Sequence, residues 1–413
     1  MENDQLLPGL FRTEYQKMVS VLCHLFGIRH IEIAEDIVSD TFLSATESWS
    51  MHGVPDNPAA WLYTVAKNKT KNYLKRNSVF EEKITPQLKN ANPEAVDPEI
   101  DLSQKNIADS QLAMIFAVCN PVISEESQIA LALNLLCGFG VQEISDAFIT
   151  NREVVYKRIK RAKEKLKETN IKIERPSLTD VATRLETVLA TLYLLFSEGY
   201  YSTSQNNTLR REFCAEAMRL TFMLIENETT NQPSVNALMA LMCFHTSRFD
   251  ARMNDKGEMI LYEDQDESLW NCELIAKGTY FLNEATTGKV LSKYHLEAYI
   301  AWWHTQKEDT QEKWENVLSL YNRLLILEYS PIAALNRTYA LAKTNGKEQA
   351  IIEAEKLKLK HYHFYYSLLG NLYTNIDNAK ALKHYEAALD LAVSETDKLL
   401  ISKNIEKLKL SGN

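Results

Sequence analysis

The side chains best suited to binding a polyanion are concentrated between Asn151 and Arg175. This segment holds ten lysines and arginines against four glutamates, in a chain of 413 residues with a formal net charge of −9. A positive face of this kind neutralises phosphates and carries donors to base edges. An ion-paired surface helix would have the same composition, so the neighbouring elements must decide between the two interpretations.

Those elements predict two helices joined by a tight turn. Residues 128–136 are mostly apolar and predict a buried helix, which Gly138 and Gly140 end where a positive φ would be costly for other residues. A short helix over 141–148 and a turn through 149–151 follow, and Asn151 is expected to cap the basic helix. The expected apolar stripe of that helix consists of Val154, Val155, Ile159, Ala162 and Leu166. This order predicts a helix-turn-helix that binds DNA.

A second basic helix is predicted upstream, over 57–76. Asn57 is expected to cap it, and Pro58 suits the first helical position. Five lysines and arginines occur between Trp61 and Arg76 without an acidic residue, and amide and tyrosine side chains are interleaved among them. Cations for phosphates, amides for base edges and a ring for stacking suit a strand whose bases are unpaired.

An acidic amphipathic helix is predicted just before it, over 30–49. Its apolar face is expected to include Ile33, Ile37, Val38, Phe42 and Ala45. Acidic side chains on the opposite face suit a basic protein partner better than DNA, although a solvated face explains them equally well.

Three motifs now support a family resemblance. In chain order they are AEDIVSDTFLSATESW, NPAAWLYTVAKNKTKNYLKR and GFGVQEISDAFITNREVVYKRIKRAKEKL. They resemble the polymerase-binding helix, the promoter-melting helix and the minus-thirty-five-reading module of bacterial RNA polymerase sigma factors, specifically the small extracytoplasmic-function (ECF) group. The resemblance covers about Leu6 to Leu166 and implies an all-α chain with sigma region 2 over 1–80 and sigma region 4 over 108–175.

The resemblance also implies site residues and partners. The partners are core RNA polymerase, through its β′ clamp helices and β flap, and promoter DNA. The implied polymerase-binding residues are Glu35, Asp36, Ser39, Asp40 and Phe42. The implied minus-ten residues are Trp61, Lys67, Asn68, Lys71, Asn72, Lys75 and Arg76, with the loop 50–56 holding an extruded base. The implied minus-thirty-five residues are Arg152, Glu153, Tyr156, Lys157, Arg158 and Arg161.

Residues 81–107 contain three prolines without a sustained helical period and predict a flexible linker.

Residues 176–413 form a long extension that resembles the tetratricopeptide-like extension of one sigma-factor subgroup. The spacing of small and large residues independently predicts such repeats over about 290–410. The residues that carry this pattern are Leu369, Gly370, Tyr373, Ala381, Tyr385 and Ala388. The repeats could bind a protein or peptide or brace the chain internally, and we expect the extension to regulate the sigma cycle.

The remaining candidate sites carry less chemistry. The cluster Glu263, Asp264, Asp266 and Glu267 could hold a metal ion, but contact with a basic surface is the better interpretation. His361 and His363 are expected at a turn or helix start, and the six scattered cysteines as reduced core thiols. No catalytic constellation, cofactor site or metal site is predicted.

The protein is expected to be cytoplasmic. It is also expected to have no membrane span, because the apolar helix over 178–200 is too short and interrupted to cross a bilayer. The sequence thus predicts a sigma factor that directs transcription initiation and catalyses no reaction. Two alternatives remain: a polymerase-independent helix-turn-helix regulator with a sensory carboxy-terminal domain, and an enzyme built on the extension.

Overall fold

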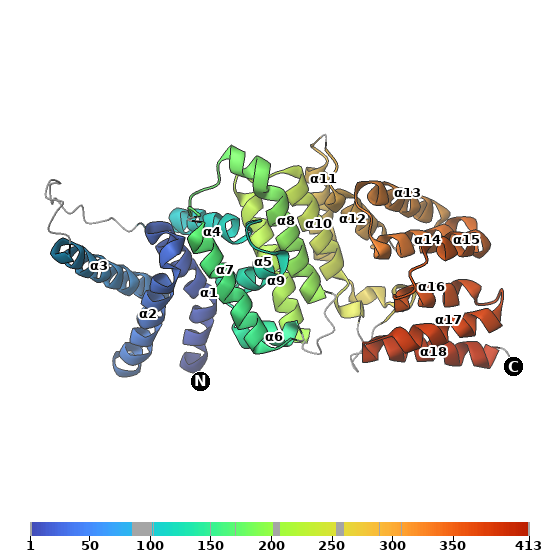
Figure 1. Ribbon diagram of the computed structural model, residues 1–413, viewed down its shortest axis with the longest axis horizontal. Coiled ribbons are helices and arrows are strands. Elements are labelled where there is room, and N and C mark those ends of the chain that lie inside the picture. Colours follow the sequence, from blue (N-terminus) through green and yellow to red (C-terminus); the bar gives the residue numbers. More distant parts are fainter. Residues whose placement is uncertain are drawn as a thin grey trace. The chain divides into compact units, whose positions relative to one another are not determined.

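The computed structural model describes residues 2–84, 101, 103–148, 150–169, 171–200, 207–252, 260–288, 290–306 and 308–411. These ranges contain α-helices and short 3₁₀ helices and no strand, which confirms the predicted all-α class. The chain divides into two compact units, Met1–Thr230 and Asn231–Asn413 (Figure 1). Most of the predicted linker, residues 85–100 and 102, lies outside the described residues.

The first unit contains both candidate DNA-binding segments. Its elements are α1 (Glu2–Phe26), η1 (Ile28–His30), α2 (Ile31–His52), α3 (Pro58–Ile84), α4 (Gln104–Val118), α5 (Glu125–Leu135), α6 (Val141–Ala147), α7 (Arg152–Glu168), α8 (Leu178–Tyr200) and α9 (Asn207–Glu226). Helix α1 packs against α2, α3 and α4, while α5 packs against α7 and α8. The helices before and after the predicted linker therefore share one core.

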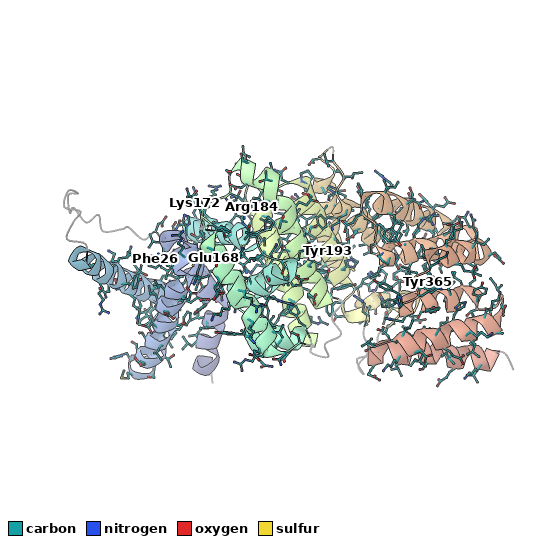
Figure 2. All side chains as sticks on the ribbon, viewed as in Figure 1. Phe26, Glu168, Lys172, Arg184, Tyr193 and Tyr365 are labelled. Carbon is teal, nitrogen blue, oxygen red and sulfur yellow. The ribbon has the colours of Figure 1, made fainter. Side chains whose placement is uncertain are left out.

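Helices α8 and α9 support the helix-turn-helix. Arg184 lies on α8 (Figure 2). Its guanidinium donates a hydrogen bond to the Phe116 carbonyl and lies over the Phe116 ring. From α9, Arg219 Nη2 donates to the Leu136 carbonyl at 3.0 Å, and the ring of Phe213 meets that of Phe139 with centroids 4.6 Å apart. The first two helices of the predicted extension thus belong to the same compact unit as α5–α7.

The second unit continues the helical chain. Its elements are α10 (Pro233–Ser247), η2 (Asp250–Arg252), η3 (Tyr262–Asp264), η4 (Glu267–Leu269), α11 (Cys272–Ala285), α12 (Lys293–Trp303), α13 (Gln311–Leu327), α14 (Pro331–Asn345), α15 (Lys347–Leu357), α16 (His363–Tyr373), α17 (Asn378–Leu391) and α18 (Glu395–Ser411). From α10 onward, each α-helix packs on the next one in the chain. Five of the six residues of the predicted repeat pattern belong to the core formed around α16 and α17, and the sixth, Gly370, is buried in α16.

Close packing of α16 on α17 depends on Gly370. A Cβ atom at this position would lie 2.8 Å from the ring of Tyr385, closer than real Cβ atoms approach a neighbour. We therefore expect Gly370→Ala to destabilise the second unit by about 1–3 kcal/mol, because the Tyr385 ring must move within a filled core. Urea unfolding of the full chain measures the change. Gly9→Ala is the control, since a Cβ at exposed Gly9 meets no atom within 4 Å, and equal effects would contradict this account.

The structure corrects several local predictions. Val154 was expected in the apolar stripe of the basic helix, but its side chain is 46% exposed because the buried face is centred on Val155. Gly138 has the expected positive φ of 78°, whereas Gly140 has a φ of −72° and caps α6. Cys272 was expected in the core with the other cysteines, but it is exposed at the start of α11.

Helix ends also differ from the prediction. Helix α2 continues to His52, so the chain leaves the helix later than the predicted loop 50–56. Helix α3 extends to Ile84 and α4 begins at Gln104, after the Ser103 cap. The expectation of a helix start in the His361–His363 segment is confirmed, since α16 begins at His363.

The acidic loop of the second unit contacts a basic side chain, as expected. Glu263 accepts hydrogen bonds from Lys343 Nζ at 2.7 Å and from the Tyr339 hydroxyl at 2.6 Å. These bonds outweigh the effect of burial and lower the pKa of Glu263. Among the described residues, no group of three or more histidine, cysteine, aspartate or glutamate side chains could hold a metal ion.

Candidate nucleic-acid interface

The start of α7 is held by short-range hydrogen bonds. Asn151 Oδ1 accepts from the backbone N–H of Glu153 at 2.8 Å, which confirms the predicted cap. At the preceding turn, the Gly140 backbone N–H donates to Glu143 Oε2 at 2.7 Å. Ile149, in the predicted turn, lies outside the described residues. The two helices of the helix-turn-helix are therefore each fixed at their amino-terminal end.

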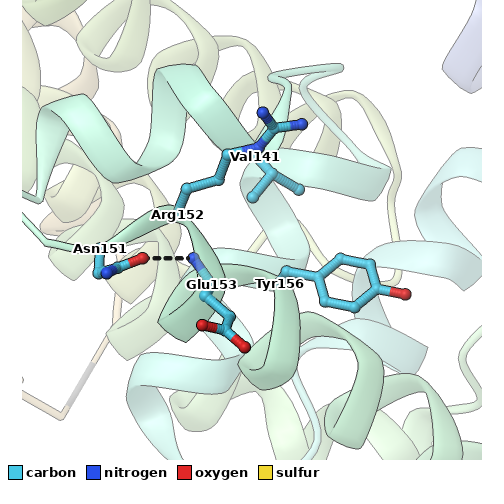
Figure 3. A pocket seen from close by; sticks show the side chains of 5 residues that line it. All are labelled: Val141, Asn151, Arg152, Glu153 and Tyr156. Atoms are coloured by element: carbon cyan, nitrogen blue, oxygen red, sulfur yellow. Dashed lines mark hydrogen bonds between the residues drawn. The ribbon is translucent and has the colours of Figure 1, made fainter.

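An open cavity of about 410 Å³ lies at this end of α7 (Figure 3). Its lining residues are Val141, Asn151, Arg152, Glu153 and Tyr156. The Tyr156 side chain is 55% exposed, and its ring extends away from the helix beside the cavity. The cavity thus presents a cation, a carboxylate and an aromatic ring at the helix end that a helix-turn-helix presents to base edges.

The predicted minus-thirty-five residues lie mainly on the exposed side of α7. Arg152, Glu153, Tyr156, Lys157 and Arg161 are exposed, whereas Arg158 is half-buried. The opposite side is buried and contains Val155, Ile159, Ala162 and Leu166. Lys157 pairs with Glu153 at 2.9 Å one turn away, so part of this face is already charge-neutralised.

Helix α3 has a comparable division. Its buried side packs against the rest of the first unit and contains Leu62, Tyr63, Ala66 and Thr70. Of the predicted minus-ten residues, Asn68, Asn72, Lys75 and Arg76 are exposed, while Trp61, Lys67 and Lys71 are half-buried. The Trp61 ring meets that of Trp49 edge to face, with centroids 5.5 Å apart. Trp61 thus anchors the start of α3, and the polar side chains extend along the helix beyond it.

The buried side of α3 is fixed to α1 by a hydrogen bond. The Tyr63 hydroxyl donates to Glu14 Oε2 at 3.0 Å, and Glu14 also pairs with Lys17 at 2.9 Å. Burial, together with the neighbouring Glu14 carboxylate, raises the pKa of Tyr63. This hydroxyl therefore stays protonated as a donor and holds the orientation of α3.

The predicted polymerase-binding residues of α2 have different environments. Asp36 is exposed, and Asp40 lies 3.8 Å from Lys69 of α3. Ser39 Oγ shares a 3.0 Å hydrogen bond with the Tyr15 hydroxyl. Phe42 is only 5% exposed and packs against Phe11 and Tyr15, so it supports the helix from inside.

Glu35 and Glu32 of α2 contact lysines of α7. Lys163 Nζ donates to both carboxylate oxygens of Glu35, at 2.7 and 2.9 Å, and Lys167 bonds to Glu32. Burial raises the pKa of Glu32, but hydrogen bonds from Lys167 and the backbone outweigh it, so this pKa is lowered. Sequence reasoning missed both contacts, for which the opposite charges of the two helices were the only available signal.

Comparison with known proteins identifies the first of these modules. Residues 10–79, which include α2 and most of α3, match the family model described as Sigma-70 region 2. The chain contains a region 2 domain of the sigma-70 family. Proteins of this family are transcription factors rather than enzymes, and region 2 implies interaction with core RNA polymerase and promoter DNA. This chain is therefore a sigma factor that takes part in transcription initiation.

Two further comparisons concern the rest of this sigma factor. Residues 184–286 match a family described as a family of unknown function, DUF6596. An uncharacterized protein of Rhizobium meliloti (strain 1021) is 30% identical over 388 residues, which cover 92% of this chain and 91% of that protein. No solved structure matches the chain. No helix among the described residues is long and apolar enough to cross a membrane.

Proposed function

We propose that this sigma factor belongs to the ECF group and uses three separate surfaces. The acidic side of α2 docks on the β′ clamp helices of core polymerase, and the polar side of α3 binds the melted minus-ten strand. The exposed side of α7 reads the minus-thirty-five element, and the module around it meets the β flap. The domains are 1–80, the linker 81–107, 108–175 and the extension 176–413.

The observation that carries this proposal is the match to Sigma-70 region 2 over 10–79, within which one helix is acidic and the next is basic. The exposed Asp36 gives α2 a carboxylate that a basic partner can reach. Exposed amides and cations along α3 suit single-stranded nucleic acid. The helix-turn-helix around α7 supplies a second DNA-binding surface further along the same chain.

The extension supports and regulates these modules. Its first helices, α8 and α9, brace the helix-turn-helix through Arg219 and Phe213. Its later helices are tetratricopeptide-like pairs over about 290–410, in which Tyr339 of α14 and Tyr373 of α16 are 34 positions apart, the length of one such repeat. Their surface takes a protein or peptide ligand whose binding alters the activity of the sigma factor.

Charge reversal on α2 tests polymerase docking. We expect Asp36→Lys to weaken binding of the full chain to core RNA polymerase by about tenfold, because it sets like charges against a basic partner surface. Glu47→Lys is the matched control, since it makes the same change at another exposed position of α2. Titration of labelled sigma factor with polymerase measures both affinities. Equal effects of the two substitutions would show that α2 does not dock through its predicted residues.

A further inference from the structure

The contact between α2 and α7 joins two paired sets of charges. Glu32 and Glu35 are three residues apart on α2, and Lys163 and Lys167 are four apart on α7, so each pair lies on one side of its helix. Lys163 Nζ contacts both oxygens of Glu35, and Lys167 bonds to Glu32. One acidic strip therefore meets one basic strip across the two modules.

The Glu35–Lys163 pair of this contact is better shielded than an ordinary surface ion pair. The side chains of Lys163 and Glu35 are 14% and 24% exposed, which reduces screening by salt and water. Helix α7 also packs on η1, at the start of α2. Two further hydrogen bonds join α1 to the helices after the linker. Gln16 Nε2 donates to the Asn134 carbonyl of α5 at 2.9 Å, and His24 Nδ1 lies 3.0 Å from Ser110 Oγ of α4.

The lysines of this contact lie in the second half of α7. The cavity and the exposed Arg152, Glu153 and Tyr156 lie at its other end. Lys163 and Lys167 are not among the residues predicted to read DNA, and both bond to carboxylates of α2. Their role is therefore best sought in the contact with α2.

Occupation of Glu35 has a direct consequence for polymerase binding. Lys163 lies against both oxygens of Glu35 and neutralises its charge, so a basic partner is attracted less strongly to this carboxylate while α7 covers it. We propose that α2 is a docking surface for a lysine-bearing helix and that α7 occupies it in the free protein, as a latch that polymerase must displace. This inference rests on the proposed function, because it takes polymerase to be the competing partner.

A zero-length carbodiimide cross-linker tests the closed state of the isolated full chain. It joins a carboxylate and an amine only where they are in contact, so we expect a Glu35–Lys163 cross-link by peptide mass spectrometry. The yield should fall when core polymerase is present in saturating amounts. Absence of the cross-link in the free chain, or an unchanged yield in the polymerase complex, would overturn the proposal.

Polymerase affinity tests the consequence of the latch. We expect the full-length Lys163→Met/Lys167→Met variant to bind core polymerase about tenfold more tightly than the wild type, because two lysines no longer compete for α2. Methionine keeps the aliphatic bulk of lysine, and circular dichroism checks the fold. Lys165→Met is the matched control, since Lys165 is exposed on the same helix between the two latch lysines, and we expect less than about a twofold change.

The outcomes separate this proposal from the one on which it rests. Equal affinities of the double variant and the control would overturn the latch while leaving the sigma function intact. Failure of the wild type and of every variant to bind polymerase would refute the proposed function instead. The cross-link in the free chain does not depend on polymerase and would still form in that case.

Discussion

Replacement of Phe213 by alanine will destabilise the first unit by about 3–5 kcal/mol, the usual cost of removing a buried phenyl ring. Phe213 is 1% exposed, and its ring contacts that of Phe139 at the turn between α5 and α6. Phe139 is itself only 4% exposed, so the cavity left by the substitution opens directly beneath the helix-turn-helix. Urea unfolding of the full chain, followed by far-ultraviolet circular dichroism, measures the loss.

Phe222→Ala provides the control for this prediction. Phe222 belongs to the same helix, α9, but is 41% exposed, so the same deletion leaves no comparable cavity. We expect it to cost less than about 1 kcal/mol. If both substitutions cost the same, α9 is not part of the core that supports the helix-turn-helix. A large difference would mean that the helix-turn-helix requires the first helices of the extension.

Acidification from about pH 7 to about pH 5 will lower the free energy of unfolding of the second unit by about 2 kcal/mol through protonation linked to His304 alone. Burial, followed by the positive charges of Arg248 and Lys313, lowers the pKa of His304 to about 3. An unfolded histidine binds a proton below its ordinary pKa of about 6.5, whereas folded His304 stays neutral down to its lowered pKa. The unfolded state then binds more protons, so stability falls as the pH drops through this window.

His304→Gln identifies the source of that pH dependence. The His304 ring lies edge to face with Tyr262 and Trp314, and its buried Nδ1 atom has no hydrogen-bond partner among the residues that the structure describes. Between pH 7 and pH 5, we expect the free energy of unfolding to fall by about 2 kcal/mol less in the variant than in the wild type, whatever the variant's stability at pH 7. Tryptophan fluorescence during urea unfolding reports on this region through Trp270 and Trp314. If the variant loses as much stability as the wild type between the two pH values, His304 is not the cause of the pH dependence.

The sequence predicted those features that depend on neighbouring residues. The Asn151 cap and the positive φ of Gly138 follow from local backbone chemistry, and both are confirmed. The choice between Val154 and Val155 as the buried residue was harder. Adjacent positions of a helix differ by about 100° in direction, so only the packed neighbours decide which of the two faces the core.

Contacts between distant residues could not be predicted in this way. Glu35 and Lys163 are separated by 128 positions, and nothing in the local pattern links them. The sequence marked α2 as acidic and α7 as basic, which suggested separate partners for the two helices. It did not suggest that the two helices bind each other, because that contact depends on how α1 packs on α4 and how α7 packs on η1.

Promoter-directed transcription by the full chain with purified core RNA polymerase tests the central claim most directly. Transcripts should begin at defined promoter positions only when the sigma factor is present. They should be lost when Lys67, Lys71, Lys75 and Arg76 of α3 are replaced together by alanine, because the melted strand then lacks its cationic contacts. Specific promoter binding by the chain alone, with no transcript in the presence of polymerase, would contradict this account and indicate a regulator that acts without polymerase.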